Sequence, residues 1–270
     1  MQTVVLSPGE KGFYLDMLSK GLRIDGRKIS ELREFRVTRD VLPLSQSSVR
    51  VTYGNGYNQT TEAIMSISTE VVTSKLSELE LSVKSLDTAF GEDSQKICEV
   101  VRNTLLSFIK NSGALAPEKL QIPNVDYSWK VYIDVLFLKA AGGIYEVPMV
   151  GIRIALASLR FPQLTISPGD SIAELHFDID ESKPPRELVS ADELPLALTF
   201  SPLGNELISD PLPSEVSVLS SLLVAGFTKD GKLIGLTHFG SRGMDANIIT
   251  DVNSRVQAMC QSYVDMVSSL

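Results

Sequence analysis

The sequence predicts an α+β protein of two related halves, in which mixed β-sheets pack on helices. In each half, segments typical of strands come first and one long amphipathic helix follows. An acidic segment with two consecutive prolines separates the halves. With 270 residues, 43% of them hydrophobic and 21% charged, the chain is long enough to bury a substantial core. This composition excludes disordered, collagen-like and disulfide-scaffold proteins.

A first helix is expected within residues 1–21. Ser7 can cap it, Pro8 suits its first turn and Glu10 completes a capping box. Its apolar residues share one face at helical spacing, and Gly21 ends the run. These apolar residues are Phe13, Tyr14, Met17 and Leu18.

Residues 22–165 are expected to form the first half. A helix is predicted over residues 92–111 from its apolar spacing, and the long apolar run Val147–Leu159 predicts a second, buried helix. Plain turns, rather than phosphate-binding loops, are expected at Gly54–Gly56 and at Gly142-Gly143. Runs rich in β-branched or alternating apolar residues predict strands at Val49–Thr52, Ala63–Val72, Leu79–Leu86 and Trp129–Leu138.

Residues 166–193 are expected to be a loop-rich, acidic, Pro-containing connecting segment, and residues 194–270 the second half. Strands are predicted at Leu194–Phe200 and Leu207–Asp210, followed by a hairpin. The hairpin joins residues 217–228 to residues 232–239 around Lys229-Asp230-Gly231. A final helix is predicted to bury a stripe consisting of Ile249, Val252, Val256, Met259, Tyr263 and Val267.

The charge balance excludes a free-standing, tight nucleic-acid binder. The formal net charge is −8, whereas such proteins usually carry an excess of basic residues. Cys98 and Cys260 are too few for a disulfide framework, so we expect a reducing compartment and two buried thiols. No secretory signal and no transmembrane helix are expected from the apolar runs.

One acidic cluster has the composition of an enzyme site, because paired carboxylates can hold a divalent cation. A solvated acidic loop is the favoured interpretation, since prolines separate its two parts. His176 and His238 are expected to be structural or surface residues, and neither a metal site nor a cofactor is expected. The cluster consists of Asp178, Asp180, Glu181, Asp192 and Glu193.

A basic segment follows the first helix, and acidic residues are interleaved with its cations. By charge alone it is a mixed surface that can pair with acidic partners or within the chain, and only a weak signal for nucleic acid. Its cations are Arg23, Arg27, Lys28, Arg33, Arg36 and Arg39, and its acids are Asp25, Glu31, Glu34 and Asp40.

Several short motifs follow one another in a specific order along the chain. They are Leu22-Arg23-Ile24-Asp25-Gly26-Arg27 followed by Arg33, the strand Val131–Leu136, Ser209-Asp210-Pro211 with Glu215, and the Lys229-Asp230-Gly231 hairpin. In this order the chain resembles the RNase PH-like subunits of the RNA exosome ring, from about residue 7 onward. The resemblance implies a structural role for the entry motif, that is, for Arg23, Asp25, Gly26 and Arg27.

The resemblance also implies partners and a setting. Family members form a six-membered ring around a pore for single-stranded RNA, and active members degrade RNA from its 3′ end with inorganic phosphate as the nucleophile. We therefore expect other RNase PH-like subunits in a hetero-hexameric ring, cap subunits, a separate catalytic nuclease, and RNA, but no membrane. The implied localisation is the cytoplasm and the nucleus, including the nucleolus, and the implied processes are ribosomal RNA processing and messenger RNA turnover.

The sequence departs from the active pattern at the phosphate site. Active members that it resembles read Gly-Gly-Thr-Arg-Thr, whose arginine binds phosphate, whereas this chain reads Gly142-Gly143-Ile144-Tyr145-Glu146. Tyr145 and Glu146 stand where a cation is needed, and we expect Glu146 to repel phosphate. The arginine-rich helix of RNA-gripping relatives is reduced to one residue, Arg102, a candidate RNA contact.

The sequence therefore predicts a non-catalytic structural subunit without catalytic residues. The alternative is an active phosphate-dependent 3′-to-5′ exoribonuclease using Asp178, Asp180 or Asp192. A chain that completes a neighbour's active site and an unrelated α+β binding module are the remaining alternatives.

Overall fold

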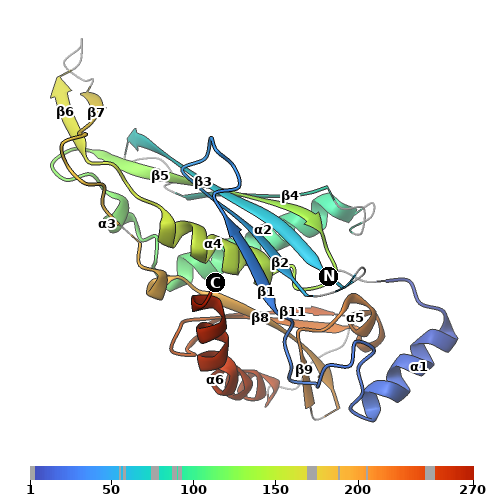
Figure 1. Ribbon diagram of the computed structural model, residues 1–270. Coiled ribbons are helices and arrows are strands. Elements are labelled where there is room, and N and C mark those ends of the chain that lie inside the picture. Colours follow the sequence, from blue (N-terminus) through green and yellow to red (C-terminus); the bar gives the residue numbers. More distant parts are fainter. Residues whose placement is uncertain are drawn as a thin grey trace.

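A computed structural model describes residues 4–54, 56, 59–73, 79–86, 90, 93–168, 175–187, 189–204, 206–240 and 247–270. Two β-sheets lie one above the other, with helices between them and helices below the second sheet (Figure 1). The prediction of an α+β fold with sheets packed on helices is confirmed. In this part of the chain, no helix has both the length and the apolar character needed to span a membrane.

The first helix, α1 (Pro8–Ser19), has the predicted capping box. The backbone N–H of Ser7 donates to the Glu10 carboxylate at 2.7 Å, and the N–H of Glu10 donates to the Ser7 hydroxyl at 3.3 Å. Only Leu18 of this helix is buried, and Phe13 is 57% exposed. The helix therefore covers little of the core, and it contacts α5 (Pro213–Leu219) at the edge of the molecule (Figure 1).

The first sheet contains each strand predicted for the first half, together with β1. Its order is β1-β2-β3-β5-β4, with β4 parallel to β5 and the other neighbours antiparallel. β2 and β3 form the expected hairpin, although Asn55 of its turn lies outside the described residues. The strands are β1 (Phe35–Arg39), β2 (Ser47–Tyr53), β3 (Thr61–Thr73), β4 (Leu79–Ser85) and β5 (Tyr127–Lys139).

Two helices lie between the sheets, and this position accounts for the apolar residues in their sequences. α4 (Glu146–Ser158) packs on β2 and β3 above and on β8 (Leu196–Leu203) below, so it is apolar on nearly all sides. α2 (Ser94–Ser112) contacts β4 and β11 (Leu233–Gly240), and the short α3 (Pro117–Leu120) follows it. Phe108 of α2 packs so closely on the second sheet that a Cβ at Gly226 would lie 2.5 Å from its ring. A larger residue at that position would force the layers apart.

The second sheet has the order β11-β10-β8-β9, and its recorded pairings are antiparallel. Its lower face is covered by α6 and α5 (Figure 1). One hydrophobic cluster runs through both sheets and the helices between them, so the two halves share a core. The elements are β8 (Leu196–Leu203), β9 (Glu206–Ser209), α5 (Pro213–Leu219), β10 (Ser221–Phe227), β11 (Leu233–Gly240) and α6 (Asn247–Ser268).

Three sequence expectations in the second half differ from the structure. Residues 217–219 end helix α5 instead of starting the hairpin, and Ser220, in the left-handed region at φ 55°, separates α5 from β10. Ile249 is 51% exposed because it lies near the start of α6, outside the buried stripe. Met259 is only partly buried, and Cys260 takes its place in that stripe.

The connecting segment is more regular than a loop. β6 (Leu164–Pro168) and β7 (Leu175–Ile179) form an antiparallel hairpin that projects from one end of the molecule (Figure 1). Phe177 anchors the hairpin on Tyr127 of β5, with ring centroids 4.8 Å apart. Cross-strand pairing thus overrides the polar composition, and a 3₁₀ turn, η2 (Ala191–Glu193), leads into the second half. The predicted boundaries of the halves stay predictions.

Candidate functional site

The entry motif packs against the second half. Arg23 is buried, and its Nε and Nη2 donate to the two carboxylate oxygens of Glu215 at 2.8 and 2.7 Å. Its Nη1 and Nη2 also donate to the carbonyl oxygens of Ser209 and Asp210. Glu215 in turn accepts the backbone N–H of Leu212 at 2.8 Å, which caps α5. One carboxylate therefore fixes both a helix start and the entry segment.

Asp210 is the centre of this arrangement. It is fully buried and lies in the left-handed region at φ 47°. Its carboxylate accepts Nε and Nη2 of Arg33 at 2.8 and 2.5 Å, and Nη1 of Arg27 at 2.7 Å. Burial by itself would raise the pKa of Asp210, but Arg33 and Arg27 beside it hold that pKa below its usual value. The carboxylate is therefore ionised at neutral pH.

Arg33 links this carboxylate to the first half. Its Nη1 donates to the carbonyl oxygens of Gln59 and Ala141, each at 2.8 Å, and its guanidinium lies 4.5 Å from the ring centroid of Tyr53. Burial would lower the pKa of Arg33, but Asp210 outweighs that effect and leaves the pKa above its usual value. We call the whole set the arginine–carboxylate junction: Arg23, Asp25, Arg27, Arg33, Asp210 and Glu215.

The Gly142-Gly143 turn packs against this junction. Both glycines have positive φ, 78° and 67°. A Cβ at Gly143 would lie 2.6 Å from Cδ1 of Tyr53, and a Cβ at Gly142 would lie 2.9 Å from the carbonyl oxygen of Pro211. The backbone of this turn is therefore pressed between the two halves, and only glycine fits there.

Tyr145 and Glu146 face the interior. Oε1 of Glu146 accepts the backbone N–H and the hydroxyl of Thr199 at 2.6 and 2.5 Å, and Oε2 has no hydrogen-bond partner. Burial and the nearby Asp210 raise the pKa of Glu146 to about 7. Tyr145 stacks on Phe239 with ring centroids 5.9 Å apart. The carboxylate of Glu146 is thus enclosed against the second sheet, and the expectation that Glu146 repels phosphate stays a prediction.

The remaining candidates lie apart from the junction. Arg102 is a half-buried residue of α2, for which the described part of the structure records no hydrogen bond or ion pair. The acidic cluster does not converge, because three of its five members pair with three different lysines. Within the described ranges no group of His, Cys, Asp and Glu residues is arranged to hold a metal ion. The acidic-cluster pairs are Asp180 with Lys183, Asp192 with Lys229, and Glu193 with Lys119.

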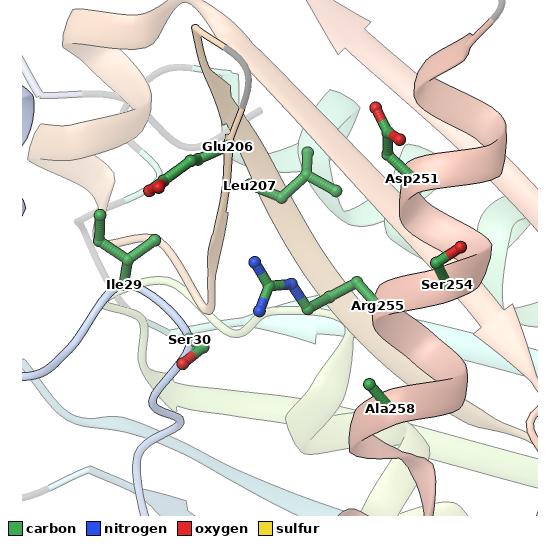
Figure 2. A pocket seen from close by; sticks show the side chains of 8 residues that line it. All are labelled: Ile29, Ser30, Glu206, Leu207, Asp251, Ser254, Arg255 and Ala258. Atoms are coloured by element: carbon green, nitrogen blue, oxygen red, sulfur yellow. The ribbon is translucent and has the colours of Figure 1, made fainter.

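An open cavity of about 530 Å³ lies beside the junction, between α6, β9 and the entry segment. Figure 2 shows Arg255 of α6 extending across it toward Ile29 and Ser30. Glu206 and Asp251 line the same cavity, so its charge is mixed. This lining contains neither a nucleophile–base pair nor a group of cations of the kind that phosphoryl transfer needs.

The junction can hold the two halves together, and within the described residues none of its arginines is left without a carboxylate for a phosphate to replace. Each guanidinium of the junction is neutralised by a carboxylate of the same chain. The sequence singled out Arg23, Asp25, Gly26 and Arg27, and it marked Asp210 and Glu215 as members of a later motif without pairing them with these arginines. Arginines at 23, 27 and 33 in an acidic chain signal that counter-ions are near, yet only the fold places Asp210 and Glu215 beside them.

Comparisons with known proteins agree with this architecture. No protein-family model matches the chain. Exosome complex component RRP42 of Saccharomyces cerevisiae is 28% identical over 232 residues, which cover 84% of this chain and 83% of that protein. Rrp42 of Methanosarcina acetivorans is 23% identical over 87% of this chain and 85% of that protein. The name stands for ribosomal RNA-processing protein 42, the ring-subunit type that the Leu6–Lys11 opening and the Trp129 strand resemble most.

Solved structures show the same fold. A chain of an archaeal exosome core has a TM-score of 0.69 at 18% identity, with 96% of each chain covered. A chain of the Archaeoglobus fulgidus exosome with RNA bound to the active site has a TM-score of 0.72 at 18% identity, with 95% and 96% covered. The chain has the RNase PH-like fold and resembles Rrp42-type exosome subunits. Rice Rrp46 has a TM-score of 0.60 at 17% identity, with 91% and 98% covered, so the likeness extends beyond the Rrp42 type.

Proposed function

We propose that this protein is a non-catalytic structural subunit of an RNA exosome ring. It supports 3′-to-5′ RNA processing and degradation by the complex and helps to form the RNA channel. The observation that carries the proposal is the arginine–carboxylate junction, whose cations are all engaged by internal carboxylates. The likeness to Rrp42 over 84% of the chain supports the ring assignment.

Catalytic inactivity follows from the chemistry that phosphorolysis requires. The attacking phosphate and the scissile phosphodiester both need cations at hydrogen-bond distance. At the turn where active relatives have an arginine, this chain has the buried Tyr145 and Glu146. A tyrosine and a carboxylate supply no positive charge to neutralise a phosphate, so the chain contributes structure to its complex rather than chemistry.

The partners follow from the same assignment. They are other RNase PH-like subunits in a hetero-hexameric ring, cap subunits, a separate nuclease, and single-stranded RNA in the pore. Arg102 on α2 is a candidate contact with RNA phosphates, because no carboxylate within the described ranges neutralises it. The proposed location is the cytoplasm and the nucleus, including the nucleolus, where ribosomal RNA is processed.

The test is the composition and activity of the complex that contains this chain. We expect affinity purification from its own cells, followed by native mass spectrometry, to give a heteromeric assembly with several different subunits of similar size. The purified chain is expected to release no nucleoside diphosphates from single-stranded RNA when inorganic phosphate is added. A homo-hexamer with phosphate-dependent activity that Asp192→Ala abolishes, but Glu206→Ala does not, would overturn the proposal and establish the exoribonuclease.

A further inference from the structure

A second group of arginines surrounds an open cavity of about 460 Å³ at the C-terminal end of α4. Arg39 ends β1, Arg153 lies in α4, and Arg160 follows that helix. Asp192 of η2 is the one carboxylate among the described lining residues, so the lining carries an excess of positive charge. That excess is unusual in a chain whose formal net charge is −8.

Arg153 is the buried arginine of this group, and its charge lacks a nearby counter-ion in the described part of the chain. It is only 5% exposed, and its recorded hydrogen bond is from Nη1 to the carbonyl oxygen of Leu194. Within the described residues, no carboxylate lies within 4.0 Å of its guanidinium, which has five N–H donors. Burial lowers the pKa of Arg153, and Asp192 compensates only in part. A buried charge without a counter-ion is strongly unfavourable.

The junction provides the comparison within the same molecule. Arg23 and Arg33 are buried to a similar degree, but each is held by a carboxylate through two N–H donors. Arg153 lines a cavity instead. Arg153 thus faces the cavity in the position where Arg23 and Arg33 each face a carboxylate.

The described side chains around Arg153 do not supply the missing counter-ion. Arg39 is exposed and has no hydrogen bond or ion pair in the described ranges. Arg160 donates to the carbonyl oxygens of Ala157 and Leu159, and it meets Glu187 only at 3.4 Å. Asp192 is bound by Lys229 at 2.6 Å and therefore neutralises Arg153 only in part. The carbonyls at the end of α4 add a partial negative charge of about one half, less than the excess of the arginines.

We infer that this cavity binds a phosphate-bearing small anion through Arg39, Arg153 and Arg160. Guanidinium groups match the oxygens of a phosphoryl group with paired N–H donors, and a dianion balances the excess charge of the lining. A carboxylate would neutralise only one of the cations. The site is separate from the Gly142-Gly143 turn, which precedes the other end of α4, roughly 20 Å away along a helix of this length.

The test is isothermal titration calorimetry of the full chain in phosphate-free buffer. The probes are inorganic phosphate, pyrophosphate and ADP, which separate a free phosphate from a nucleotide as the source of the phosphoryl group. The double variant Arg39→Ala/Arg160→Ala alters two exposed side chains and should weaken binding at least tenfold. Arg153→Met, checked for folding by circular dichroism, should weaken it further.

Arg255→Ala is the matched control, because Arg255 also lines an open cavity and has no recorded ion pair within the described ranges. It should bind each probe as the unaltered chain does. Equal loss in Arg255→Ala and the double variant would mean non-specific charge attraction and would overturn the inference. The inference also fails if none of the three anions binds at millimolar concentration. Neither result depends on whether the chain belongs to a ring.

Discussion

The buried carboxylate of Glu146 makes the free energy of unfolding depend on pH. Its Oε1 is fully hydrogen-bonded to Thr199, whereas its Oε2 is buried without a partner. Removing a carboxylate from water disfavours the ionised form, and the Asp210 carboxylate nearby disfavours it further. The pKa in the folded protein, about 7, therefore lies above the ordinary value of 4.5.

Glu146→Gln should stabilise the protein more at pH 8 than at pH 5. Since the folded-state pKa is raised, the wild-type free energy of unfolding falls as pH rises from about 4.5 to about 7 and stays low above that. Glutamine keeps the acceptor for Thr199 and does not ionise. The gain of the variant over wild type should be about 2 kcal/mol larger at pH 8 than at pH 5, measured by urea unfolding.

Glu206→Gln serves as the control, because Glu206 is an exposed carboxylate of β9. Its effect on the free energy of unfolding should be small at both pH values. If the free energies of unfolding of Glu146→Gln and wild type differ by the same amount at pH 5 and pH 8, the pKa of Glu146 is the same in the folded and unfolded states, and the prediction is wrong.

At the scale of elements, the Gly142-Gly143 turn determines how α4 enters the core. The backbone N–H of Ala141 donates to the Thr61 hydroxyl at 2.8 Å, and that hydroxyl donates to the carbonyl oxygen of Gly142. The turn is therefore bound to β3 just before α4 passes between the two sheets. The Arg33 guanidinium and the Tyr53 ring leave no room for a side chain here.

Gly143→Ala should destabilise the protein by about 2–4 kcal/mol. The left-handed backbone contributes about 1 kcal/mol of this, and overlap of the new Cβ with Tyr53 contributes the rest. Gly21→Ala isolates the backbone effect, because Gly21 has φ 75° and no atom within 4 Å of its Cβ position. Chemical denaturation of both variants checks the difference, and equal losses would mean that the turn is not packed against Tyr53.

At the scale of the whole molecule, the arginine–carboxylate junction connects the two halves. Asp210 belongs to the second half, whereas Arg33 also binds the carbonyl oxygens of Gln59 and Ala141 in the first. The shared hydrophobic core supplies most of the stability, and the junction specifies how the entry segment and the halves are aligned.

Asp210→Asn should cost about 3–5 kcal/mol in the free energy of unfolding, because it leaves the buried Arg33 without its anion, whereas the half-buried Arg27 keeps Asp25. Asp192→Asn, which removes the exposed partner of Lys229, should have little effect. Urea denaturation measures both. Because the pKa of Asp210 is lowered in the folded state, its stabilising contribution is present above about pH 4 and is lost as pH falls below that value. A cost for Asp210→Asn no larger than for Asp192→Asn would exclude this role.

The periodic elements could be predicted from the sequence because their patterns are local. The helices at α2, α4 and α6 and the strands of the first sheet follow from apolar spacing, and the α1 capping box follows from Ser7 and Glu10. Patterns failed where tertiary contacts compete with composition. The β6–β7 hairpin is held by the Phe177–Tyr127 contact, and residues 217–219 complete a helix whose start is fixed by Glu215 and Leu212.

By itself, the sequence determined the fold class, the positions of most helices and strands, and the resemblance carried by the entry motif. Only the tertiary structure decided which charges neutralise one another. Arg23 meets Glu215 across 192 residues, and Arg33 meets Asp210 across 177. Arg153, equally basic in sequence, receives no carboxylate within the described residues and lines a cavity instead. Ion pairing depends on distances of a few ångströms between segments that only the packed core brings together, so no local pattern in the chain can specify it.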